Sequence, residues 1–67
     1  MILNTTQEKI IHILNEHKID RVGMAGVLGT LRDNNLDEEE FLRFIQNKKD
    51  LCIEDCTRKL WDMRGYY

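Results

Sequence analysis

Proline and serine are both absent from the chain, and aromatic residues make up only 7% of its 67 residues. Without proline, nothing but short polar turns interrupts the helical segments. No apolar run approaches the roughly 18 residues that a membrane-spanning helix needs, so we expect no membrane segment. The lack of serine also removes a common hydroxyl nucleophile.

Basic clusters are lacking as well. The net charge is −2 and the pI is near 5.6, which disfavours nucleic-acid binding by bulk attraction to phosphates. Met1-Ile2-Leu3 leads directly into polar residues, so we expect no signal peptide. We therefore expect a cytoplasmic protein whose two cysteines are reduced thiols.

Apolar residues recur at three- and four-residue steps in four segments, and no segment alternates in the manner of a strand. The sequence therefore predicts an all-α fold, a small single-domain bundle of four short helices over residues 1–67. The predicted helices lie at about 6–17, 21–32, 38–49 and 52–64.

Helix-start signals support these boundaries. Thr5 and Glu8 are spaced as a capping box, in which each side chain accepts a hydrogen bond from the backbone N–H of the other residue. Asp37 and Glu40 repeat the pattern before the third helix. Asp20 is placed to cap the second helix.

The predicted second helix contains an uncharged stretch, residues 22–31, in a chain that is one-third charged. One side of this helix is large and apolar: Met24, Val27, Leu28 and Leu31. The opposite side is small rather than polar: Val22, Ala25, Gly26 and Gly29. Neither side is suited to water, so we expect a central Gly-rich helix that is buried on both sides. Close approach of a neighbour would then offset the roughly 1 kcal/mol cost of each interior glycine.

Two cysteines and a histidine suggest a metal site as one alternative. Cys52 and Cys56 are one helical turn apart and are predicted to face inward, and His17 falls on the core face of the first helix. A fourth ligand is missing from the pattern. The simpler interpretation is that the thiols act as small buried hydrophobes and that no cofactor is bound. A zinc-stapled binding module remains the alternative.

A helix-turn-helix DNA-binding regulator is a second alternative. Ala25 and Gly29 have a spacing compatible with the first helix and turn of that motif. The recognition helix would then begin at Asn34 or Asp37 and would carry four consecutive carboxylates toward DNA. Phosphates would repel them, so nucleic acid is not the favoured partner.

No convergent set of nucleophile, acid and base is visible, so we expect no enzymatic activity. What remains is surface recognition, for which Trp, Tyr and Arg are the most frequent energetic anchors. The candidate partner-binding residues near the C-terminus are Arg58, Trp61, Arg64, Tyr66 and Tyr67. A second candidate contact is the acidic start of the third helix, at Asp37, Glu38 and Glu39.

The favoured interpretation is a small non-catalytic regulator or inhibitor that docks on another protein or occludes it. Small proteins encoded by phages and mobile elements often act in this way, although that analogy rests on size and composition alone. Because a core this small supplies only about 3–5 kcal/mol, a second copy of the chain is also a candidate partner.

Overall fold

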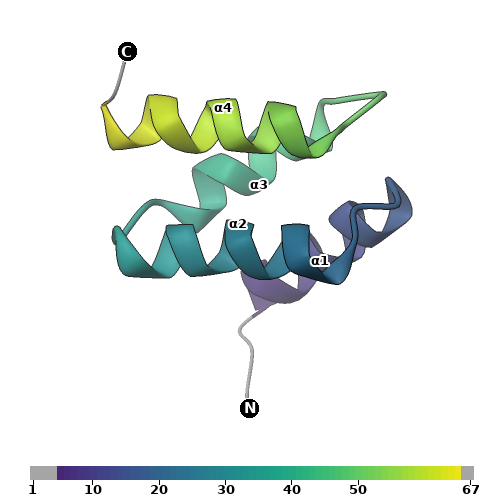
Figure 1. Ribbon diagram of the computed structural model, residues 1–67, viewed down its shortest axis with the longest axis horizontal. Coiled ribbons are helices and arrows are strands. Elements are labelled where there is room, and N and C mark those ends of the chain that lie inside the picture. Colours follow the sequence, from purple (N-terminus) through teal and green to yellow (C-terminus); the bar gives the residue numbers. More distant parts are fainter. Residues whose placement is uncertain (1–4, 66–67) are drawn as a thin grey trace.

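The computed structural model describes residues 5–65, and these form an all-α bundle. Figure 1 shows the helices in order. They are α1 (Thr5–Glu16), α2 (Arg21–Asp33), α3 (Glu38–Gln46) and α4 (Ile53–Arg64). The prediction of four short helices is therefore confirmed. Over this part of the chain, no helix combines the length and apolar character that crossing a membrane demands.

The helix starts follow local chemistry. The Asp20 carboxylate accepts a hydrogen bond from the backbone N–H of Gly23 at 2.8 Å, which caps α2. Asp37 caps α3 by accepting from the N–H groups of Glu39 and Glu40. In the turn between α2 and α3, Asn35 adopts φ of 55°, the left-handed conformation that asparagine tolerates well.

Helix α3 is three residues shorter than predicted. Its C-cap is Asn47, whose side-chain amide donates to the carbonyl of Arg43 at 2.8 Å and so satisfies an acceptor at the end of the helix. Lys48 follows the helix instead of extending it, and its ammonium lies 5.2 Å from the centre of the Phe44 ring. The apolar stripe ends at Ile45, so nothing beyond that residue holds another helical turn to the core.

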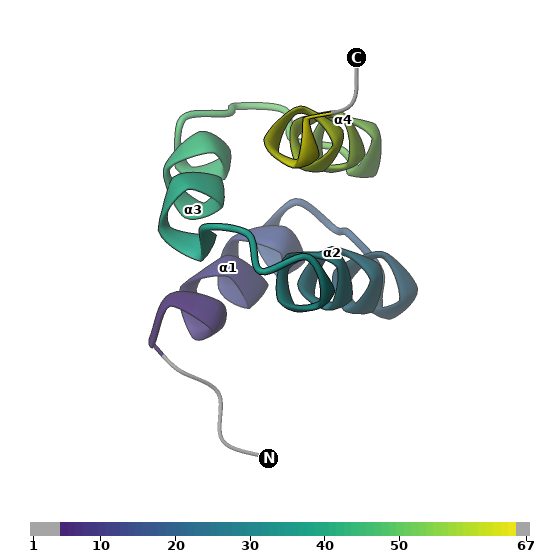
Figure 2. The same ribbon diagram turned by 90° about the vertical axis from the view of Figure 1, so that its left-hand side faces the viewer.

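The four helices surround a single core. Viewed end-on, α2 and α4 form one side of the bundle and α1 and α3 form the other (Figure 2). Each helix contributes to the core, as do the two connections that contain Ile19 and Leu51. The buried residues are Ile10, Leu14, Ile19, Val27, Leu31, Phe41, Leu42, Ile45, Leu51, Cys56 and Leu60.

Helix α2 differs from the expectation of burial on both sides. Its large side packs on the core through Val27 and Leu31, but Val22 is 81% exposed, and Ala25 and Gly26 are exposed as well. The reason is topological. Helix α2 is an edge of the bundle with neighbours in α1 and α4, and no element covers its outer side within residues 5–65.

The start of α4 also departs from the predicted stripe. Cys56 is buried as expected and Leu60 is buried too, but Cys52 is exposed and Ile53 is 41% exposed. Cys52 is the N-cap, with extended φ and ψ of −128° and 168°. A helical projection of 100° per residue does not apply to a residue outside the helix, so the prediction that Cys52 faces inward with Cys56 is wrong.

Candidate protein interface

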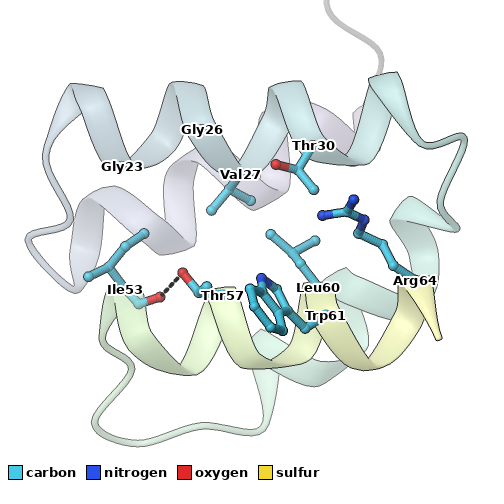
Figure 3. Close-up of a pocket in the computed structure, with 9 residues that line it drawn as sticks. All are labelled: Gly23, Gly26, Val27, Thr30, Ile53, Thr57, Leu60, Trp61 and Arg64. Atoms are coloured by element: carbon cyan, nitrogen blue, oxygen red, sulfur yellow. Dashed lines mark hydrogen bonds between the residues drawn. The ribbon is translucent and has the colours of Figure 1, made fainter. Parts of the chain in front are cut away.

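A groove of about 240 Å³ runs between α2 and α4 on the outside of the bundle (Figure 3). The two helices lie side by side and point in the same direction along the chain (Figure 1). We call this the α2–α4 groove. Its lining residues from α2 are Gly23, Gly26, Val27 and Thr30, and those from α4 are Ile53, Thr57, Leu60, Trp61 and Arg64.

The lining residues follow helical spacing because they form one row on each helix. From Gly23 the α2 row steps by three, four and seven residues, and from Ile53 the α4 row steps by four, seven, eight and eleven. Val27 and Leu60 are also core residues, so they form the floor of the groove. The walls of the groove are therefore helices packed on the core, not loops.

The narrow end of the groove lies at the starts of the two helices. A Cβ added at Gly23 would come within 2.9 Å of Ile19 Cγ2 and within 3.2 Å of Ile53 Cδ1. Gly23 therefore permits α2 and α4 to approach each other. Gly26 and Gly29 differ, because a Cβ at either would meet nothing within 4 Å. Their lack of a side chain leaves space on the outer side of the bundle.

Exposed apolar surface is concentrated on this side. The three large hydrophobic residues that residues 5–65 leave exposed are Val22 at 81%, Ile53 at 41% and Trp61 at 56%. All three belong to α2 or α4, and Ile53 and Trp61 line the groove itself. Two exposed hydrophobic side chains in one groove are typical of an interaction site, whereas scattered exposed hydrophobic residues are not.

The groove has little charge. Arg64 is the sole ionisable residue among its lining residues, and no carboxylate lines it. The Arg64 side chain reaches back toward Thr30 at the far end of the groove, and the Trp61 ring lies beside Thr57 (Figure 3). The Thr57 hydroxyl donates to the Ile53 carbonyl at 3.0 Å, so it is already used within α4.

Of the predicted C-terminal binding residues, the structure brings Trp61 and Arg64 together in the groove. Arg58 is exposed on α4 but does not line the groove, because it lies on another side of the helix. Tyr66 and Tyr67 lie outside the described residues.

The predicted acidic contact surface is largely engaged in contacts within the chain. Beyond the capping role of Asp37, Glu38 accepts from the Gln7 amide at 2.9 Å and Glu39 accepts from the Thr6 hydroxyl at 2.7 Å. These bonds join the start of α3 to the start of α1. The acidic run thus has a structural role, and carboxylates also sit at the positive end of the α3 dipole.

The next residue of the run, Glu40, pairs with Lys59 of α4 at 3.3 Å. The Lys59 ammonium also lies 5.4 Å from the centre of the Phe44 ring, and its side chain is only 19% exposed. Its long stem therefore packs across the junction of α3 and α4 while its charge reaches a partner. The sequence pattern gave no sign of this contact.

The predicted zinc ligands do not converge. Cys52 is exposed at the N-cap of α4, Cys56 is buried in the core and His17 is half-buried at the end of α1. Residues 5–65 contain no group of three His, Cys, Asp or Glu side chains placed to hold a metal ion. The Cys52 thiol and backbone N–H both donate to Asp55, which lowers the pKa of that carboxyl. Burial raises the pKa of the Cys56 thiol to about 11, which disfavours the thiolate that metals require.

Among the described residues, two further hollows are lined by more ionisable side chains than the α2–α4 groove. One is bordered by the acidic start of α3 and the turn before it, including Asp37, Glu38 and Glu39. The other lies along α1 and includes Glu8, Lys9 and His12. His12 there pairs with Glu16 at 2.6 Å, one helical turn away. Neither hollow brings together exposed large hydrophobic side chains.

The groove was missed by sequence reasoning although part of its signal was present. Of the α2 residues that line the groove, only Gly26 belongs to the side recognised as small, and that side was expected to be covered. Thr30 and Thr57 carried no signal, since threonine on a helix surface is unremarkable in sequence. Comparisons with protein-family models, with curated proteins and with solved structures gave no match.

Proposed function

We propose that this chain is a small non-catalytic regulator or inhibitor that binds another protein in the cytoplasm through its α2–α4 groove. The groove forms the docking surface. Trp61 is the central anchor. The chain acts by occupying its partner's surface rather than by chemical change of a substrate.

The observation that supports this proposal is the concentration of exposed large hydrophobic side chains on α2 and α4. Trp61 keeps 56% of its surface exposed although it lies beside the core residue Leu60. Transfer of that indole from water into an interface is favourable, and Trp is the residue most often found to dominate binding energy. The flat, uncharged wall of α2 opposite Trp61 offers an apolar surface for the same partner.

The chemistry of the groove supports binding over catalysis. Its polar groups are two threonine hydroxyls and one guanidinium, without a lining carboxylate, histidine or thiol to act as a general base. A guanidinium has N–H donors but no acceptor, so it cannot act as a general base. Such a set orients a partner but does not activate a nucleophile.

The direct test is affinity capture from the native host's lysate with three baits: the wild-type chain, Trp61→Ala and Arg43→Ala. Arg43 is exposed on α3, away from the groove, and serves as the matched control. We expect one protein to be retained by the wild-type and Arg43→Ala baits and lost with Trp61→Ala. With the purified partner, the Trp61→Ala change should weaken binding by at least about 1–2 kcal/mol.

The purified partner then allows the regulatory part to be tested. Addition of the wild-type chain should change the partner's own activity, and the Trp61→Ala chain at the same concentration should not. Circular dichroism of both variants checks that the fold is retained. Equal retention of the partner by the folded Trp61→Ala bait would reject the groove as the docking surface.

A further inference from the structure

We draw no further inference here: the strongest candidate, the outer side of α2 around the exposed Val22 and Ala25, is an apolar helix face, and nothing in the part of the chain that the structure describes shows what covers it.

Discussion

The side of the bundle formed by α1 and α3 and the side formed by α2 and α4 differ in how their helices meet. At the first, the paired helix starts are joined by the Thr6–Glu39 and Gln7–Glu38 hydrogen bonds. At the second, the helices meet closely at Gly23 and Ile53, then leave a groove with an apolar floor.

The difference shows which side of the bundle has exposed side chains that are not needed to hold the fold together. Polar side chains at the start of α3 are used to hold the bundle together, although their sequence suggested an acidic contact patch. Apolar side chains of α4 that could have been buried are instead left on the outside. Moving an exposed indole or aliphatic side chain out of water is favourable. A partner that covers these side chains would therefore gain that transfer free energy on binding.

The largest expected loss of stability distinguishes two aromatic residues, one in the core and one in the groove. Phe41 of α3 is 0% exposed, and Phe41→Ala should cost about 3–5 kcal/mol, because the lost transfer energy and the cavity add. That approaches the whole stability of a domain this small, so the variant should be largely unfolded. Trp61→Ala, by contrast, should lose about 1 kcal/mol or less, since its indole is already half in water. Urea unfolding followed by circular dichroism measures both, and equal losses would contradict the distinction between anchor and core.

A pH titration tests whether water is excluded from the core-facing side of α4, where Cys56 lies. The folded Cys56 thiol has a pKa raised from 9.0 to about 11, so between these values the unfolded chain releases a proton that the folded chain keeps. Stability should therefore be fully present below pH 9 and should fall as pH rises toward 11, by at most about 1.4 kcal/mol per pH unit. Cys56→Ala should remove this part of the slope, and a slope identical to that of the wild type would show that water reaches the thiol.

Thiol labelling gives a simpler version of the same comparison. At pH 8, a maleimide should modify the exposed Cys52 rapidly and Cys56 only after unfolding. Mass spectrometry of the native and urea-unfolded chain, with Cys52→Ala as the control, distinguishes the two sites. Fast native labelling of Cys52→Ala would contradict the burial of Cys56.

Smaller effects are expected from the glycines of α2. Gly26→Ala should raise stability by about 0.5–1 kcal/mol, because alanine favours the helix and its methyl group meets open space. Gly23→Ala should give no such gain, because its Cβ would lie 2.9 Å from the buried Ile19 side chain. Urea midpoints of the two variants measure the difference. A gain at both positions would show that α2 and α4 move apart at little cost.

The smallest effect concerns Lys59, which joins α3 to α4. Lys59→Met keeps the packed stem but removes the charge, and should cost about 0.5 kcal/mol because the pair with Glu40 is partly exposed. Lys59→Ala removes the stem as well and should cost more. Thermal unfolding at low and high salt separates the two contributions. A loss for Lys59→Met that high salt does not reduce would argue against the ion pair.

The four helices and most of the core were predictable because they depend on local signals. Capping at Asp20 and Asp37 and the apolar repeats of α1 and α3 are properties of short segments. The candidate site was predictable only in part. Trp61 and Arg64 were identified by residue type, but the groove between α2 and α4 was not predicted, because the small side of α2 was expected to be covered.

The sequence by itself therefore determined the helices, the starting caps of α2 and α3 and the large apolar face that each helix turns inward, since these follow from backbone geometry and side-chain chemistry within a dozen residues. Only the tertiary structure decided which helix became an edge. Periodicity shows that a side of α2 is small, but not whether another element covers it, because that depends on how four helices divide one core among them. The exposed outer side of α2 and the groove between α2 and α4 are both results of that division.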